Sequence, residues 1–259
     1  MNYETILVEK EETFMIITLN RPPLNVVNRQ MLEELMDILD KTEDDSTVRS
    51  IILTGNGKHF CGGADVRLKE NFSAQAQEPF HELGRRMVDR IELYPKPMIA
   101  AVKGKCFYGG TGLAWPCDIR ISGESGKFRA GDAYLGIVSS WGVGLVRTAH
   151  WIGRNRALDI MILGEIFDGK RAVELGVMTK VVPDTQLMEE AKAAARTIAQ
   201  AAPISLRFIK EGVAMSIKGT YAEAKAKEVE LVRKIYQTED SQEGLAALLE
   251  DRRPNFKGR

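Results

Sequence analysis

The amino-acid sequence predicts an α/β fold in which strands alternate with helices, followed by a largely helical C-terminal third. Two observations lead to this fold class. Runs of apolar and β-branched residues, closed by Pro or Gly, recur through the first part of the chain. From about Arg147 onward the segments become rich in Ala, Glu, Lys and Leu, which favour helix. Because strands separated by helices usually pair in parallel, we expect mainly parallel pairing.

Each expected element of the first part has a local reason. Thr13–Leu19 (TFMIITL) is apolar and β-branched and is ended by Asn20–Pro23, so it predicts a strand. Apolar residues then fall at helical spacing from Arg29 to Leu39, with Asn28 as the N-cap. Further strands are expected at Ser50–Thr54, Met98–Val102, Ile119–Ser122 and Val181–Val182.

The later part of the chain predicts a series of helices: Arg154–Leu163, Arg171–Leu175, Gln186–Ala202, Ile204–Ala214, Tyr221–Tyr236 and Gln242–Arg252. No sheet remains to cover all of their faces. We therefore expect these helices to pack on the first part of the chain and on other subunits. The expected division is a core of residues 1–200 and a helical oligomerisation domain of residues 201–259.

Composition argues against several classes of function. The 36 basic and 36 acidic residues give a formal net charge of zero, whereas a nucleic-acid-binding surface needs concentrated basic charge. No apolar stretch reaches the roughly 20 residues of a membrane span, and no secretory signal is recognised. The three cysteines and three histidines include no Cys-x-x-Cys pair, so no metal site is expected. We expect a cytoplasmic protein without nucleic-acid or membrane partners.

Two glycine-containing segments follow predicted strands and precede helices. They are Lys58–Asp65 (KHFCGGAD) and Gly104–Gly112 (GKCFYGGTG). Ligands of α/β folds bind at such junctions, and glycine lets a backbone N–H group approach a ligand closely. Two N–H groups converging from the two loops would form an oxyanion hole. The alternative is that both glycine pairs only form tight turns. Neither segment matches the dinucleotide-binding or P-loop pattern.

Four separated segments, in order along the chain, carry a specific signature: Asn20-Arg21-Pro22 with Leu24-Asn25; Ile52–Gly55 with Phe60–Asp65; Pro97–Gly104 followed by Gly109-Gly110 and Cys117-Asp118; and Glu243-Gly244 through Arg252–Phe256. Through these segments the chain resembles the crotonase superfamily, the enoyl-CoA hydratase/isomerase family, over nearly its whole length.

The resemblance implies a fold of stacked ββα units forming a spiral, with a helical C-terminal trimerisation domain. It implies a homotrimer or a hexamer built as a dimer of trimers. It also implies an acyl-CoA thioester substrate, whose carbonyl oxygen would accept hydrogen bonds from the N–H groups of Gly62 and Gly109 as an enolate forms. Ala64 and Asp65 would flank the adenine pocket. Coenzyme A would be part of the substrate, and no separate cofactor or metal is expected.

The chain departs from the family at the acid–base positions. Family hydratases usually hold one water between two glutamates; here Gly112 stands at the first position and Asp132 at the second. One carboxylate can still move a proton between two carbons or activate a water. The alternative is that Asp132 is a surface or capping residue.

A second departure lies in Gly136–Gly144 (GIVSSWGVG), where the family more often has a Pro-Gly-x-Gly-Gly turn. Trp141 and Tyr108 would wall the acyl pocket and offer a hydrogen-bond donor, although both residues could equally be core aromatics. The unusual loop suggests an acyl group that is cyclic or otherwise not a straight chain.

These observations favour an enzyme that hydrates an enoyl-CoA or isomerises its double bond, with Gly62, Gly109 and Asp132 as its catalytic groups. A second hypothesis is decarboxylation or C–C hydrolysis of an acyl-CoA, which the missing first carboxylate would permit. A third is a non-enzymatic RNA-binding or scaffold protein on the same fold, which the neutral net charge disfavours.

Overall fold

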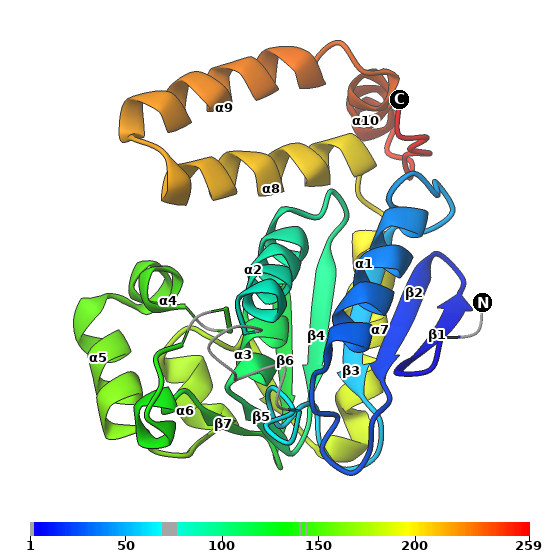
Figure 1. The fold of residues 1–259 in the computed structure, drawn as a ribbon. Helices are drawn as coiled ribbons and strands as arrows, with labels where there is room; N and C mark the ends of the chain where they lie inside the picture. The colour runs from blue at the N-terminus through cyan, green and yellow to red at the C-terminus, as the bar shows by residue number, and fades with distance from the viewer. Residues whose placement is uncertain (1–2, 69–76, 140, 143) are drawn as a thin grey trace.

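A mainly parallel sheet forms the centre of the molecule (Figure 1). The computed structural model describes residues 3–68, 77–139, 141–142 and 144–259, and within them this sheet has six strands in the order β1-β2-β3-β4-β6-β9. The strands are β1 (Ile6–Glu11), β2 (Phe14–Leu19), β3 (Ser50–Gly55), β4 (Met98–Val102), β6 (Ile119–Gly123) and β9 (Lys180–Val182). Only the β1–β2 pair at one edge is antiparallel; the other neighbours are parallel. The predicted α/β class is confirmed. In this sheet, β1 is the strand that the sequence does not predict.

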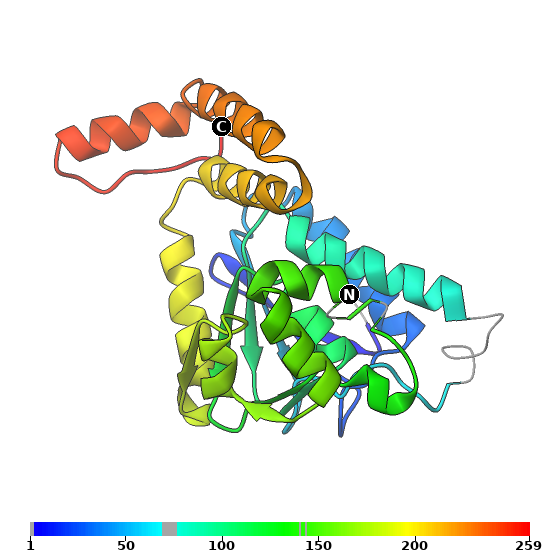
Figure 2. The same cartoon turned by 90° about the vertical axis from the view of Figure 1, so that its left-hand side faces the viewer.

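Helices cover both faces of this sheet. On one face lie α1 (Arg29–Glu43) and α2 (Gln77–Leu93), and on the other lies α7 (Leu187–Ile198), as the side view in Figure 2 shows. Successive side chains of β2 point to opposite faces of the sheet. Phe14 belongs to the buried cluster under α7, whereas Ile17 belongs to the cluster under α1 and α2. Because both faces are covered, the central strands are mainly apolar, and β4 (MIAAV) is apolar and buried along its whole length. The predicted N-cap is confirmed: the Asn28 side chain accepts a hydrogen bond from the Met31 N–H at 2.9 Å.

A smaller sheet forms from segments for which the sequence predicts no strand. Within the described residues it has three strands, β5 (Lys105–Phe107), β7 (Lys127–Arg129) and β8 (Phe167–Asp168). The predicted loop Gly104–Gly112 is therefore wrong as a single loop. Its first half is β5, which pairs in parallel with β7, and its second half opens the short helix α3 (Gly109–Ala114). Strands of three residues carry too little periodicity to be recognised from sequence.

Short helices connect this small sheet to the rest of the chain. They are the 3₁₀ turn η2 (Asp132–Leu135), α4 (Leu145–Ile152), α5 (Arg154–Leu163), α6 (Gly169–Glu174) and the 3₁₀ turn η3 (Asp184–Gln186). The sequence predicts α5 with its observed bounds and α6 to within two residues, but misses α4. Part of the unusual segment Gly136–Gly144 falls on residues 140 and 143, which lie outside the described residues.

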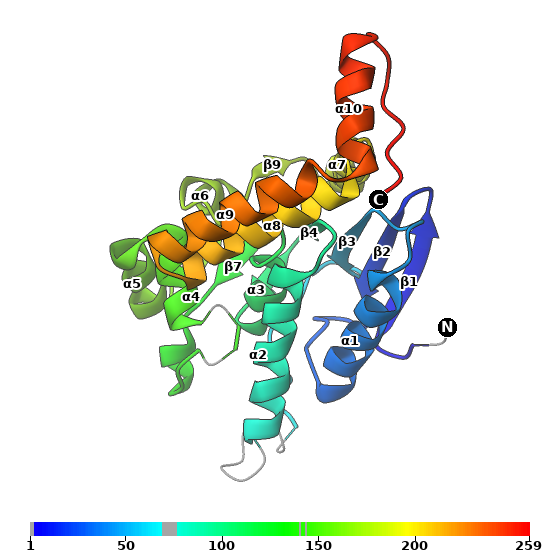
Figure 3. The same ribbon diagram turned by 90° about the horizontal axis from the view of Figure 1, so that it is seen from above.

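The last three helices lie at one end of the sheet. The helices α8 (Pro203–Lys218) and α9 (Tyr221–Ile235) run side by side across it, and α10 (Glu239–Leu249) projects away with the C-terminal segment beside it (Figures 1 and 3). An ion pair of 2.5 Å between Lys210 Nζ and Asp118 Oδ2 ties α8 to the core. The predicted start of the last helix at Gln242 is three residues late, because Thr238 caps it by accepting from the Ser241 N–H. The domain boundary near residue 200 stays a prediction.

Candidate active site

A cavity of about 970 Å³ brings together every residue that the sequence singles out for a functional role. Its wall includes Gly62, Ala64, Asp65, Tyr108, Gly109, Asp132 and Trp141. The two glycine segments meet there because a parallel β-bridge joins Cys61 to Cys106. Two backbone bonds close this bridge, from the Cys61 N–H to the Lys105 oxygen and from the Phe107 N–H to the Cys61 oxygen, each 3.0 Å long.

The structure corrects the predicted donor in the first segment. The N–H group of Gly62 already donates to the backbone oxygen of Leu24, with a nitrogen–oxygen distance of 2.7 Å. One N–H group makes one good hydrogen bond, so Gly62 has no donor left for a ligand. Gly62 lines the cavity, but as a donor in an oxyanion hole the prediction is wrong. The described residues directly after this segment, 66–68, are not helical, and the next helix that the structure describes is α2.

The free donor of this segment is instead the N–H group of Ala64. Val27 bonds to both neighbours of Ala64: its N–H donates to the Gly63 oxygen and its oxygen accepts from the Asp65 N–H, both at 2.8 Å. In such a parallel bridge the N–H of the middle residue points away from the partner strand. The structure records no acceptor for the Ala64 N–H among the described residues.

The second donor is the N–H group of Gly109, the first residue of α3. An N–H in the first turn of a helix has no acceptor within that helix. A Cβ atom built on Gly109 would lie 3.4 Å from the Ala64 nitrogen, so the two donors are close neighbours. Tyr108, which precedes Gly109, turns the chain with φ of 51° and donates its own N–H to the backbone oxygen of Arg129. The structure therefore offers a paired donor site at Ala64 and Gly109.

Asp132 supplies a carboxylate on the wall of the same cavity. It begins the η2 turn directly after β7. Burial raises the pKa of its carboxyl group, and this effect is opposed by a hydrogen bond from the Ser139 hydroxyl and by the backbone N–H of Asp132. The predicted alternative, an exposed or capping aspartate, does not fit a half-buried side chain that lines a cavity. A carboxyl group of this kind holds and releases protons closer to neutral pH than an exposed one.

No second carboxylate can be accommodated at Gly112. A Cβ atom at this position would overlap the Cα of Gly142 and would lie 2.8 Å from the carbonyl carbon of Gly142. The backbone of the segment after Trp141 fills the space that a side chain would need. The absence of an acid at position 112 is therefore a property of the packing as well as of the sequence.

Trp141 is both a core residue and a cavity wall. Its side chain is only 5% exposed and meets the ring of Phe80 edge-on, with ring centroids 5.8 Å apart. Its indole packs against two glycines: Cβ atoms built on Gly84 of α2 and on Gly109 would each lie 2.6 Å from an indole atom. The indole therefore fits only where both positions lack a side chain. The role of Gly84 was not predicted, because a lone glycine inside a helix pattern has many explanations.

The carboxylate of Asp65 forms ion pairs with two arginines. It is buried and lies 3.1 Å from Nη2 of Arg21 and 2.8 Å from Nη2 of Arg67. The hydrogen bonds from Arg67, and then from Arg21, lower the pKa of Asp65 to about 2 despite the opposing effect of burial. Arg21 and Arg67 also line the cavity, so the cluster presents positive charge there. In the sequence, Arg21 could be noticed through its place in the Asn20-Arg21-Pro22 motif. No sequence motif indicated a role for Arg67.

The opposite wall carries two further titratable residues of α2 that the sequence analysis did not single out. Glu78 and His81 both line the cavity. Glu78 is paired with Arg85, and burial lowers the pKa of His81.

Within the described residues, no group of three or more His, Cys, Asp or Glu side chains could hold a metal ion. In the same part of the chain, none of the helices is long and apolar enough to cross a membrane.

Comparison with known proteins finds one family over nearly the whole chain. A family model described as enoyl-CoA hydratase/isomerase matches residues 9–259. A probable enoyl-CoA hydratase of Mycobacterium bovis is 35% identical over 263 residues, spanning 100% of both proteins. A crotonyl-CoA hydratase of Syntrophomonas wolfei is 33% identical over 258 residues, spanning 99% of each. The crystal structure of an enoyl-CoA hydratase from Bacillus anthracis superposes with a TM-score of 0.93 at 32% identity, over 99% of this chain and 100% of that one. The predicted crotonase-like fold with C-terminal helices is confirmed.

Proposed function

The chain belongs to the enoyl-CoA hydratase/isomerase family, and from that premise we propose that it hydrates an enoyl-CoA or moves the double bond of one. The substrate would be an acyl-CoA thioester held in the cavity described above. The names of the relatives, a crotonyl-CoA hydratase among them, support this class of reaction. Coenzyme A would enter as part of the substrate, with no separate cofactor.

One observation carries the proposal: two adjacent free N–H groups, at Ala64 and Gly109, line the same cavity as the half-buried carboxylate of Asp132. The thioester oxygen would accept both N–H groups. Charge that moves onto this oxygen as the enolate forms is then stabilised by donors that are already in place. Each such donor contributes about 2.7–4 kcal/mol to the transition state in other enzymes.

Asp132 would move the protons in either reaction. In hydration it takes a proton from water while the water oxygen bonds to C3, and the displaced electron pair reaches the thioester oxygen. The enolate then takes the proton back at C2. In isomerisation Asp132 removes a proton from C2 of a 3-enoyl-CoA and returns it at C4. General acid–base help of this kind is worth about 10²–10⁴-fold in rate.

The cavity also has groups suited to the two ends of an acyl-CoA. We assign the phosphate end to Arg21 and Arg67, because guanidinium groups bind phosphates through paired hydrogen bonds and both line the cavity. We assign the acyl end to Tyr108 and Trp141. A buried indole against Gly84 leaves limited depth, which favours a compact acyl group, including a cyclic one, over a long straight chain.

The test is an activity assay on four thioesters: crotonyl-CoA, a 3-enoyl-CoA, a cyclic dienoyl-CoA and a malonyl-type CoA. Loss of the enoyl absorbance with a mass gain of one water identifies hydration, and a shift of the double bond without mass change identifies isomerisation. Turnover of the malonyl-type substrate alone would favour decarboxylation, which needs no second carboxylate and so fits the closed position at Gly112.

Full activity of Asp132→Asn would exclude Asp132 as the acid–base group. Binding of RNA without binding of any acyl-CoA would exclude an acyl-CoA enzyme altogether.

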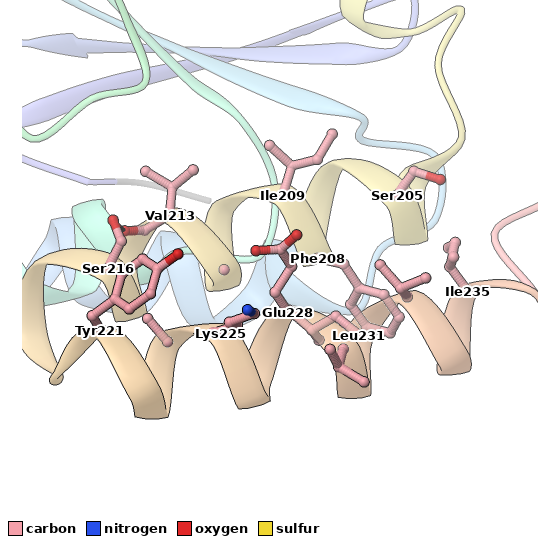
Figure 4. Close-up of a pocket in the computed structure, with 14 residues that line it drawn as sticks. Ser205, Phe208, Ile209, Val213, Ser216, Tyr221, Lys225, Glu228, Leu231 and Ile235 are labelled. Carbon is pink, nitrogen blue, oxygen red and sulfur yellow. Dashed lines mark hydrogen bonds between the residues drawn. The ribbon is translucent and has the colours of Figure 1, made fainter.

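We further propose that copies of this chain assemble through the apolar face of α8 and α9. A groove of about 740 Å³ runs between these helices, and Figure 4 shows the side chains that line it. Ile209 is 61% exposed and Val213 59% exposed, which is unusual for residues of this size on a solvated surface. A second copy would cover this face, in a homotrimer or in a hexamer formed by two trimers. We place the assembly in the cytoplasm, with no nucleic-acid or membrane partner.

A further inference from the structure

The Asp132 carboxylate has one side-chain partner among the described residues. The hydroxyl of Ser139 donates to Oδ2 of Asp132, with an oxygen–oxygen distance of 2.5 Å. This is the length of a strong hydrogen bond from a hydroxyl to a carboxylate. Asp132 lines the cavity, whereas Ser139 is half-buried and is not among the described residues that line it. Within the described residues, the contact that links Ser139 to the cavity is therefore its hydrogen bond to Asp132.

The backbone between the two residues forms a closed loop that brings them together. The N–H of Gly136 donates to the oxygen of Ala133 at 3.0 Å, and the N–H of Ile137 donates to the oxygen of Asp132 at 3.3 Å. Gly136 then reverses the chain with φ of 72°, a conformation that favours glycine. This local geometry returns Ser139 to the side chain that begins the turn.

A single catalytic carboxylate needs such a hydrogen-bond partner more than two carboxylates that share a water do. An aspartate side chain has two rotatable bonds, and a second acid that could hold a shared water is excluded at Gly112 by the backbone of Gly142. A hydrogen bond to Oδ2 restrains the orientation of the carboxylate, and no described side chain donates to Oδ1. Small errors of position are costly, because proton transfer requires hydrogen-bond distance between donor and acceptor.

We propose that Ser139 is a positioning residue for the acid–base step: its hydroxyl holds one oxygen of the Asp132 carboxylate, so that the other oxygen exchanges a proton with the substrate or with water. This inference rests on the proposed role of Asp132 and extends it. The hydroxyl also stabilises the ionised carboxylate, which is the form that accepts a proton.

Other charged groups around Asp132 do not replace this contact. The charged or titratable side chains on the surrounding elements include Tyr134 on η2, Lys127 and Arg129 on β7, Tyr108 before α3, Arg154, Arg156 and Asp159 on α5, Glu78 and His81 on α2, and Arg21, Asp65 and Arg67 at the cavity. Burial raises the pKa of Asp132, and the Ser139 hydroxyl and the backbone N–H of Asp132 oppose this rise. None of these three effects comes from a charged neighbour among the described residues. Removal of the Ser139 hydroxyl therefore acts on Asp132 without a compensating ion pair.

The experiment compares Ser139→Ala, Ser139→Thr and Asp132→Asn with the unmodified protein. Steady-state rates are measured from pH 5 to pH 9 on crotonyl-CoA, and affinity is measured with butyryl-CoA, which lacks the double bond. A hydrogen bond to a charged group corresponds to about a 10- to 100-fold change in rate, so Ser139→Ala is expected to lose that much kcat with little change in butyryl-CoA affinity. The acid limb of kcat/KM should move to higher pH, and Ser139→Thr should restore both properties.

Ser241→Ala is the matched control, because the Ser241 hydroxyl donates only to the Thr238 backbone oxygen in α10. It should leave the pH profile unchanged. Inactivity of Asp132→Asn together with normal rates and an unmoved acid limb in Ser139→Ala would overturn the positioning role while leaving the proposed function intact.

A second measurement keeps the inference testable if crotonyl-CoA is not a substrate. In protein labelled with ¹³C at the aspartate carboxyl groups, the signal missing from Asp132→Asn belongs to Asp132. Its titration should move to higher pH in Ser139→Ala and return in Ser139→Thr. An unchanged titration in Ser139→Ala would contradict the contact itself, whatever reaction the protein catalyses.

Discussion

The backbone of Gly142 occupies the space in which a side chain at Gly112 would begin. A Cβ atom at position 112 would lie 2.8 Å from the carbonyl carbon and 3.0 Å from the carbonyl oxygen of Gly142. Backbone atoms cannot rotate away as a side-chain end can. The segment that carries Trp141 and the position that lacks an acid are therefore a single structural feature: the segment can lie against α3 only because residue 112 is glycine.

Substitution of Gly112 by Ala should destabilise the protein. The added methyl group must push the 141–142 backbone off α3, and overpacking of this kind costs typically about 1–3 kcal/mol. The midpoint of urea unfolding should fall accordingly. Gly212→Ala is the matched control, since a Cβ atom there meets only a Leu231 methyl group at 3.5 Å and alanine is the better helix former. Equal stability of Gly112→Ala and the unmodified protein would show that the segment can move freely.

The donor assigned to Ala64 can be tested without altering any side chain. Incorporation of the α-hydroxy acid analogue of alanine at position 64 replaces the amide N–H by an ester oxygen. Loss of one oxyanion donor is expected to lower kcat by about 10²–10³-fold. The same exchange at Gly62 removes the hydrogen bond to Leu24 and should affect stability by about 1 kcal/mol with kcat largely kept. If the exchange at Gly62 lowers kcat more than the exchange at Ala64 does, Gly62 is the donor.

Asp132→Asn should raise stability while it removes activity. Burial raises the pKa of the Asp132 carboxyl above its unfolded value of about 3.9, so the folded state binds the proton more tightly than the unfolded state. The unmodified protein therefore loses stability as pH rises from about 4 through the folded pKa. The asparagine variant lacks this loss and can still accept from Ser139. Urea unfolding at a series of pH values should show the stability difference grow with pH and then level off; a difference of constant size would contradict the raised pKa.

The sequence predicts the large elements of this fold because they repeat a period over many residues. The strand at Phe14–Leu19 and the helix begun by Asn28 are long enough for both pattern and boundary to be recognised. Three-residue strands such as Lys105–Phe107 are not, since their pairing depends on a partner more than twenty residues away. The two glycine segments of the site follow from their place after predicted strands, whereas Asp132 and the acyl-CoA substrate follow from the family resemblance.

The choice between Gly62 and Ala64 shows where sequence reasoning stops. Both residues belong to one short motif, and both place an N–H group in the same turn. Which N–H is free depends on the bridge to Val27 and the bond to Leu24, and those residues lie in a distant segment of the chain. The role of Ser139 depends instead on a local turn, because the reversal at Gly136 returns it to Asp132. In both cases backbone geometry, and not residue type, decides the role.

Trp141 should set the size of acyl group that the site accepts. Trp141→Leu removes most of the indole from the cavity wall and opens space toward Gly84 and Phe80. The ratio of kcat/KM for a long-chain enoyl-CoA to that for crotonyl-CoA should rise by about 10-fold or more, the discrimination of even one methylene in an apolar pocket. Trp115→Leu is the matched control, because Trp115 is equally buried but does not line this cavity. An unchanged ratio in Trp141→Leu would place the acyl group elsewhere.

Charge on the α8–α9 face should break the proposed assembly. Val213→Glu places a carboxylate in the mainly apolar groove that a second copy would cover, and burial of a charge is strongly unfavourable unless the charge is paired. Sedimentation velocity should show a shift from trimer or hexamer to a smaller species, while the folded monomer persists because Val213 is exposed within one chain. Lys234→Glu, on an exposed residue of α9 that does not line the groove, is the control and should leave the assembly intact. If Val213→Glu sediments as the unmodified protein does, the subunits meet through another surface.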